Sequence, residues 1–171
     1  MKNLEIKCRV NAFAPTRRAL RTLGAVRQAP VLEQVDWYFD VPRGRFKLRQ
    51  MNGGAGELIF YMRPTRRAAR VSDFSRLPVG DIPATRHLLA AALGEAACVR
   101  KRRELWLHKN ARIHLDQVDG LGRFLEVEVV ITQGIRQAQT LMRALLTGLA
   151  VEPDTLVAHS YAELVARASA R

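Results

Sequence analysis

The sequence is short of acidic and aromatic residues, and both shortages bear on its partners. Its 16 Asp and Glu residues stand against 28 Lys and Arg residues, for a formal net charge of +12, which favours an anionic partner. An arginine-rich proteome would account for part of this excess. Aromatic residues make up 6% of the chain and are not interleaved with the basic ones. Nucleic-acid binding is therefore disfavoured, because single-stranded nucleic acids are bound on aromatic stacking platforms.

Cysteines and long apolar runs are also scarce. Cys8 and Cys98 lack the spacing of a metal site, and Cys8 lies on the apolar side of an expected strand. We therefore expect a reduced, buried thiol in a cytoplasmic protein. No stretch approaches the length of a membrane span, and the opening MKNLEIKCRV holds no apolar signal region. The length predicts one domain, residues 1–171, with a sizeable core.

Strict alternation of ionic and apolar residues is what the sequence has in abundance. It is clearest in residues 112–130, RIHLDQVDGLGRFLEVEVV, which predict two strands joined by a tight turn at residues 119–122. Because successive side chains point to opposite faces of a strand, each strand has one ionic and one apolar face. The ionic faces carry Arg112, His114, Asp116, Glu126 and Glu128.

Six other segments repeat this pattern, so we expect eight strands in all. The six are residues 3–10, 34–40, 45–50, 57–63, 71–79 and 98–107. Four helices are expected as well: from Pro15 to Gly24, from Pro83 to Gly94, over residues 135–149, and after a capping box formed by Ser160 and Glu163.

The helices indicate which face of the strands is covered. Each has an apolar stripe to bury, and the only apolar surface available is the apolar face of the strands. We therefore predict an α+β, mainly β fold: an eight-stranded antiparallel β-barrel with helices packed outside. Its interior would be lined by Glu5, Lys7, Arg9, Lys47, Arg49, Arg63, Lys101, Arg103, Arg112, Asp116, Glu126 and Glu128.

So many cations in a narrow space require anions between them. Two cations ~4 Å apart repel by about 4 kcal/mol at an effective dielectric constant of 20. The interior carboxylates offset part of this repulsion. A barrel of eight strands is wide enough for side chains or one small ligand, so a small polyanion is the expected occupant.

The same residues carry a family resemblance. The chain resembles the CYTH proteins, triphosphate tunnel metalloenzymes that include class IV adenylate cyclases and thiamine triphosphatases. The matching segments are NLEIKCRV, DWYFD, RFKLR, ELIFYMRP, VRKRRELW, RIHLDQVDGLGRFLEVEV and SYAEL. The family opens with an alternating ExExK signature, and Asn3 replaces its first Glu here. The metal site thereby loses one anionic ligand.

The resemblance implies roles for the interior residues. It assigns Glu5, Glu126 and Glu128 to a site for Mg²⁺ or Mn²⁺, and adds Lys7 and Asp116 to the catalytic group. The triphosphate clamp would comprise Lys7, Arg9, Lys47, Arg49, Arg63, Lys101, Arg103 and Arg112. The chemistry agrees, because these metals take carboxylate and phosphate oxygens, and Glu126 and Glu128 are about 7 Å apart along their strand.

The expected function is metal-dependent phosphoryl transfer on a triphosphate: ATP, thiamine triphosphate or inorganic tripolyphosphate. The enzyme would be a triphosphatase or a class IV cyclase that converts ATP to cyclic AMP and pyrophosphate. The alternative is a non-catalytic module that binds polyphosphate or a 5′-triphosphate, with chemistry impaired by Asn3. No membrane partner is expected, and the oligomeric state, a homodimer included, stays open.

Several residues keep two interpretations. His114 would relay a proton or be a hydrogen-bonded structural residue, and Tyr61 would contact the ligand or fill the barrel wall. Asp36 would be structural or face the tunnel. A loop with three arginines is expected to be solvated, with a lid over the tunnel as the alternative; these are Arg66, Arg67 and Arg70.

Overall fold

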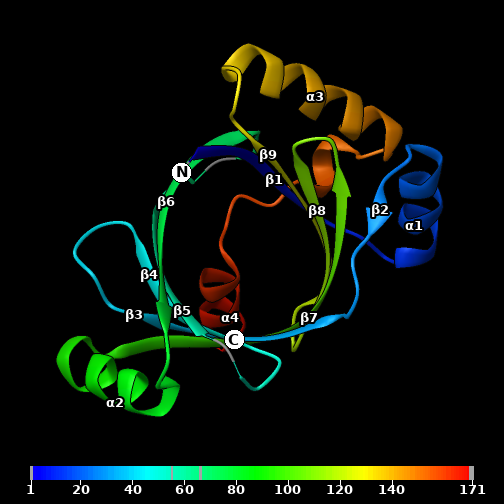
Figure 1. Ribbon diagram of the computed structural model, residues 1–171. Helices are drawn as coiled ribbons and strands as arrows, with labels where there is room; N and C mark the ends of the chain where they lie inside the picture. Colours follow the sequence, from blue (N-terminus) through cyan, green and yellow to red (C-terminus); the bar gives the residue numbers. More distant parts are fainter. Residues whose placement is uncertain (1, 55, 66, 170–171) are drawn as a thin grey trace.

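Eight antiparallel strands close into a barrel in the computed structural model, which describes residues 2–54, 56–65 and 67–169 (Figure 1). The order around the barrel is β7-β3-β4-β5-β6-β1-β9-β8, and β8 pairs back onto β7. The strands are β1 (Lys2–Arg9), β3 (Leu32–Phe39), β4 (Arg45–Met51), β5 (Gly56–Met62), β6 (Arg70–Val79), β7 (Glu95–His108), β8 (Ala111–Val118) and β9 (Gly122–Val130). The predicted fold class is confirmed.

One short strand was not predicted. β2 (Val26–Arg27) pairs with Trp106 and Leu107 of β7, beyond the point where β3 leaves that edge. Two residues are too few for alternation to be recognised, so the sequence offered no signal for it.

The described chain has four α-helices, three outside the barrel wall and one at its end. They are α1 (Phe13–Thr22), α2 (Ile82–Leu93), α3 (Ile135–Gly148) and α4 (Tyr161–Ser169), with a 3₁₀ turn η1 (Pro153–Thr155) before the last. In Figure 1, α1 and α3 lie outside one side of the barrel and α2 outside the opposite side. None of these helices is long and apolar enough to cross a membrane.

The apolar faces of the strands point outward and form the core beneath the helices. Ile6, Ile113 and Val127 from β1, β8 and β9 are almost fully buried there. They pack in one cluster with Met142 and Leu145 of α3, and with Leu20 of α1 and Cys8, whose thiol is free as expected. Burying this surface leaves the ionic faces turned to the barrel interior.

Helix α2 packs on the barrel through fewer residues than predicted. Asp81 caps it by accepting a hydrogen bond from the Ala84 amide, and Ile82 inserts against β5 at Gly56. The predicted apolar stripe is only partly covered: Leu88 is 66% exposed and Leu93 is 37% exposed. The expectation that the whole stripe is buried was therefore wrong.

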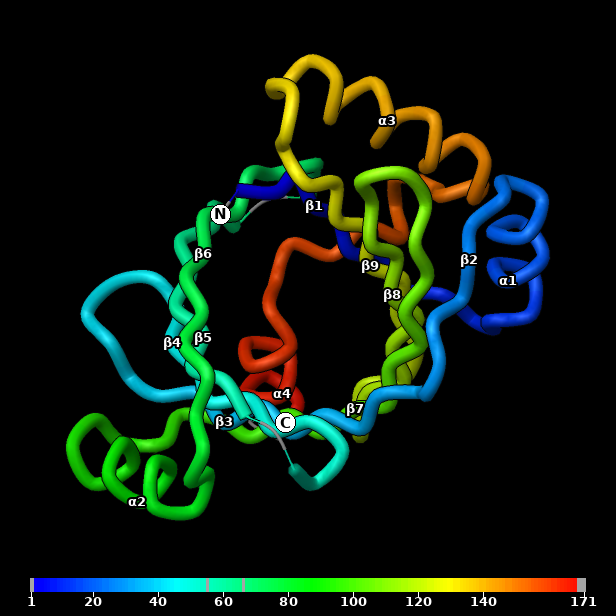
Figure 2. The backbone as a smooth tube through the Cα atoms, in the orientation of Figure 1, coloured from blue at the N-terminus to red at the C-terminus, as the bar shows by residue number. Residues whose placement is uncertain are grey.

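Helix α4 and the segment before it lie across one end of the barrel (Figure 2). The capping box is confirmed, because the Ser160 and Glu163 backbone amides each donate to the other residue's side chain. Tyr161 packs on Phe124 at a centroid separation of 5.1 Å, in a cluster with Tyr38, Val99 and Val118. Lys7 and Arg70 donate to the carbonyls of His159 and Val157, and Arg45 pairs with Glu163. Strands β1, β3, β4, β6, β7, β8 and β9 thus all contact this closing segment.

Candidate functional site in the barrel interior

The barrel interior holds a cavity of about 270 Å³, just below the usual range for small-molecule pockets. Its lining has twice as many basic side chains as acidic ones. The basic residues are Lys7, Lys47, Arg49, Arg63, Arg76, Lys101, Arg103 and Arg112, and the acidic residues are Glu5, Glu57, Glu126 and Glu128. Of these, Arg76 and Glu57 were not among the predicted site residues.

Strand register produces the ion pairs of the cavity. Residues directly opposite each other on paired strands share a face, so their side chains meet. Lys7 lies opposite Glu126, with 3.2 Å between its Nζ and a carboxylate oxygen. Arg112 lies opposite Glu128 and donates to it over 2.8 Å. In the described structure every cavity carboxylate is paired with at least one cation.

Asp116 lies behind the lining and is completely buried. It accepts hydrogen bonds from Arg103 (2.6 Å), Lys101 (3.1 Å) and the Tyr161 hydroxyl (2.9 Å). Burial alone would raise the pKa of its carboxyl group, but Arg103 and Lys101 hold that pKa well below its usual range. Because both oxygens are occupied, Asp116 is suited to orient these two cations.

Asp36 plays the same part on β3, which lies on the other side of β7 from β8, and it is a structural residue behind the cavity lining. It is completely buried and accepts from Lys47 over 2.8 Å and from the Arg49 fork over 2.7 and 2.8 Å. The charges of Arg49 and Lys47 overcome its burial and lower its pKa. The two strands that flank β7 thus each carry a buried aspartate that holds one lysine and one arginine toward the cavity.

The buried lysines are easily deprotonated in the empty cavity. Burial is the main cause, and it lowers the pKa of Lys7 to about 8 in spite of Glu126. Burial, with Arg49 beside it, lowers the pKa of Lys47 to about 7. An anion in the cavity would favour the charged form of both side chains.

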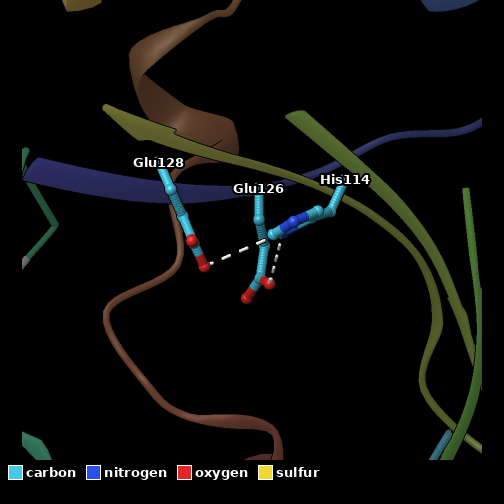
Figure 3. A group of neighbouring side chains, drawn as sticks. All are labelled: His114, Glu126 and Glu128. Atoms are coloured by element: carbon cyan, nitrogen blue, oxygen red, sulfur yellow. Dashed lines mark ion pairs between the residues drawn. The ribbon is translucent and has the colours of Figure 1, made fainter. Parts of the chain in front are cut away.

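A group of three possible metal ligands extends from β8 and β9 toward one point (Figure 3). His114 Nδ1 is 3.8 Å from Glu126 Oε2 and 3.8 Å from Glu128 Oε1. This nitrogen is buried and has no hydrogen-bond partner among the described residues, and burial, then Arg103, lowers the pKa of His114. A neutral imidazole beside two carboxylates fits a divalent cation.

Glu5, the third predicted metal ligand, is not part of this group. Its carboxylate pairs with Arg63, and it lies 3.6 Å from Arg70. Arg70 is 1% exposed, so the expectation of a solvated loop was wrong for this residue. It is the first residue of β6 and lies opposite Glu5 in register. Arg67 is exposed, and Arg66 lies outside the described residues.

Two predicted residues differ in how they relate to the cavity. Arg9 continues the ionic face of β1 but is exposed at the strand end, where it donates to the Leu121 carbonyl. Tyr61 lines the cavity, next to the charged groups of Arg63 and Arg45. The remaining predicted residues lie in or directly behind the cavity wall.

Several residues of the cavity were missed by the sequence prediction. Tyr161 belongs to the SYAEL segment, and its ring lies 3.4 Å from Lys7 Nζ. Others are uncharged residues of the ionic faces, and only their alternation with apolar neighbours could have identified them. These are Gln34, Tyr38 and Ser72.

A comparison with models of protein families identifies one family. The model of the CYTH domain matches residues 1–161. A comparison with curated protein sequences finds no match. Among solved structures, a Pyrococcus horikoshii protein has 24% identity and a TM-score of 0.84, with 95% of this chain and 98% of that chain covered.

Two further structures carry functional descriptions of their own. A Vibrio parahaemolyticus protein, proposed to be an adenylate cyclase, has 18% identity and a TM-score of 0.76, covering 96% of this chain and 97% of that one. A Hippeastrum protein, described as a proposed adenylyl cyclase with dominant triphosphatase activity, has 10% identity and a TM-score of 0.63, covering 99% and 96%. At these identities the likeness shows the fold alone.

Proposed function

The chain belongs to the CYTH domain family, and from this premise we propose that it binds a triphosphate with a divalent cation inside the barrel and cleaves it. The observation that carries the proposal is the excess of cations around the cavity inside the barrel. Basic side chains outnumber acidic ones there even when Asp36 and Asp116 are included. A triphosphate is small enough for the space and supplies the missing negative charge.

The basic residues would hold the phosphate oxygens. Arg49 and Arg103 have planar guanidinium groups, and their Nη1 edge, which Asp36 and Asp116 do not occupy, would contact phosphate. Asp36 and Asp116 fix these guanidinium groups and the neighbouring lysines, so the donors are oriented before the ligand arrives. Preorganised donors of this kind stabilise the charge that develops during phosphoryl transfer.

His114, Glu126 and Glu128 would hold Mg²⁺ or Mn²⁺, and substrate oxygens would complete the coordination sphere. When bound, the cation neutralises phosphate charge and lowers the pKa of a water molecule. Lys7 and Arg103, which now pair with Glu126, are placed to turn to phosphate oxygens instead. Glu5 as a further ligand stays a prediction.

The test is a product assay on ATP, thiamine triphosphate and tripolyphosphate with Mg²⁺ or Mn²⁺. We expect release of inorganic phosphate, whereas cyclic AMP with pyrophosphate would identify a cyclase. Glu126→Gln and Glu128→Gln should each lower turnover by about a hundredfold, because each removes an anionic ligand. The matched control is Glu33→Gln, since Glu33 lies on the outer surface and is 73% exposed.

Two results would contradict this assignment. Wild-type turnover in both glutamine variants would show that these carboxylates hold no catalytic metal. Tight binding of tripolyphosphate without any product would favour the alternative of a non-catalytic binding module.

A further inference from the structure

The two ends of the cavity differ in chemical character. The end closed by the α4 segment carries charge, with Lys7, Lys47 and Lys101 close to Tyr161 or Tyr38. The other end of the barrel is a mouth with a different lining. The apolar and neutral side chains there are Asn3, Leu32, Gln34, Met51, Ser72, Phe74 and Leu105, and the Arg76–Glu57 ion pair lies beside them.

One wall of the mouth carries a single amide, with apolar neighbours toward the opening and Lys101 of β7 directly opposite it. Gln34 on β3 lies directly opposite Met51 on β4, and Leu32 lies one inward-facing position further along β3 toward the mouth. On the other side, Leu105 of β7 lies opposite His114 of β8. The apolar side chains Leu32, Met51 and Leu105 are half-buried, so each presents carbon surface to the cavity.

The other wall carries the second amide. Asn3 on β1 lies directly opposite Ser72 on β6, and Phe74 is the next inward-facing residue of that strand. Because β1 and β3 are four places apart in a closed ring of eight strands, Asn3 and Gln34 face each other across the lumen.

Both amides have an unused acceptor. Asn3 is 3% exposed and Gln34 is 4% exposed, and neither Asn3 Oδ1 nor Gln34 Oε1 has a hydrogen-bond partner within the described part of the chain. A buried acceptor without a partner is unfavourable, and functional sites are where such atoms are retained. A carbonyl oxygen accepts hydrogen bonds from N–H or O–H groups, and a fully ionised phosphate chain has neither.

We propose that this mouth binds the organic half of the substrate and thereby selects an organic triphosphate, such as a nucleoside triphosphate, over inorganic tripolyphosphate. The inference rests on the proposed function, because it takes the triphosphate to lie deeper, among the cations. Gln34 and Asn3 accept hydrogen bonds from the organic half, while Leu32, Met51 and Leu105 contact its apolar surface. Asn3 is then a specificity residue where the family signature has a carboxylate.

Equilibrium binding without divalent metal tests the proposal separately from turnover. The probes are tripolyphosphate, ATP, GTP, CTP, UTP and thiamine triphosphate, titrated by calorimetry. At least one organic triphosphate should bind more tightly than tripolyphosphate, although it carries less charge. Gln34→Ala and Asn3→Ala should each lower the affinity for that ligand about tenfold, which corresponds to the loss of one hydrogen bond. The affinity for tripolyphosphate should stay within twofold of the wild-type value.

Gln50→Ala is the matched control, because Gln50 precedes Met51 on β4 and faces away from the cavity, with its amide donating to Gly53. Met51→Ser is a second probe on the apolar wall, at a half-buried position that tolerates a smaller side chain. It should weaken the organic ligand alone.

The failures are distinguishable. If tripolyphosphate does not bind the wild-type protein, the proposed function is contradicted, and this inference with it. If tripolyphosphate binds but no organic probe binds more tightly, or if the mouth variants weaken all ligands equally, the proposed function stands and the selective mouth is overturned.

Discussion

Burial lowers the pKa of three cavity lysines, and two of them, Lys7 and Lys47, give the ligand-free protein an unusual pH dependence at the residue scale. In the unfolded chain both keep their protons to an ordinary pKa of 10.5, whereas in the folded protein Lys7 has a pKa of about 8 and Lys47 of about 7. Between pH 7 and 9 the unfolded state therefore binds more protons, and stability rises with pH. Each fully released proton contributes about 1.4 kcal/mol per pH unit.

We expect the melting temperature of the ligand-free protein to rise by several degrees from pH 7 to pH 9. Above pH 9 the gain should become smaller, because burial raises the pKa of Cys8 to about 11 and the earlier ionisation of the unfolded thiol offsets one of the two lysines. Lys47→Met should show a smaller rise. Saturating tripolyphosphate should abolish it, since the ligand holds both lysines charged. If the melting temperature of the ligand-free wild type stays constant or falls over this pH range, the lowered pKa values of the two lysines are contradicted.

Alternation predicted most of the cavity residues because it fixes the face on which a side chain lies. It could not predict where a strand leaves the barrel, and so Arg9 was assigned to the interior although it is exposed at the strand end. The opposite error was made for Arg70, which was expected in a solvated loop and is buried. It follows two loop arginines in the sequence, and only the pairing of β6 with β1 brings it to Glu5. The alternation within a strand does not specify which residues of a distant strand lie opposite it.

At the scale of elements, the attachment of α2 depends on one glycine. A Cβ atom at Gly56 would lie 1.7 Å from Ile82 Cδ1 and 3.2 Å from the Arg49 carbonyl oxygen. Gly56→Ala should therefore destabilise the protein by about 1–3 kcal/mol, the usual cost of overpacking. For a chain of this size that is a fall in melting temperature of roughly 2–12 °C.

Two further variants make the α2 test specific. Gly80→Ala is the control, because its Cβ would meet no described atom within 4 Å. Gly56→Ala combined with Ile82→Val, which removes Cδ1, should recover part of the loss. Equal melting temperatures for Gly56→Ala and Gly80→Ala would show that α2 does not need this close approach.

The eight barrel strands and the four helices were predictable because alternation and capping signals are local. The position of α4 was not. Its apolar residues predict that it packs on an apolar surface but do not identify that surface. The contact that places it is the hydrogen bond from the Tyr161 hydroxyl to Asp116 inside the barrel. Packing across a barrel end depends on the ring of strands being closed, which no segment shows by itself.

For the whole molecule, the ligand should contribute a large share of stability. The cavity cations repel one another when it is empty, and tripolyphosphate at one hundred times its dissociation constant adds about 2.7 kcal/mol. We expect a rise in melting temperature of roughly 5–11 °C, measured by thermal unfolding. Sulfate at matched ionic strength is the control, and an equal shift from sulfate would indicate only generic anion binding.

The variant pair for this measurement lies on neighbouring residues of β7. Arg103 is 6% exposed and faces the cavity, whereas the side chain of Arg102 is 70% exposed on the outer surface. Arg103→Lys keeps the charge and loses the fork, so it should reduce the shift. Arg102→Lys should leave the shift unchanged.

The α4 segment also makes the barrel blind-ended, and this fixes an order of events. With one end filled by Tyr161 and its neighbours, a ligand enters and leaves through the same mouth. A triphosphate that enters phosphate-first places its terminal group innermost, so after cleavage the outer fragment blocks the way. The last part to enter must be the first to depart, and free phosphate should be the product that lingers and competes with the next substrate.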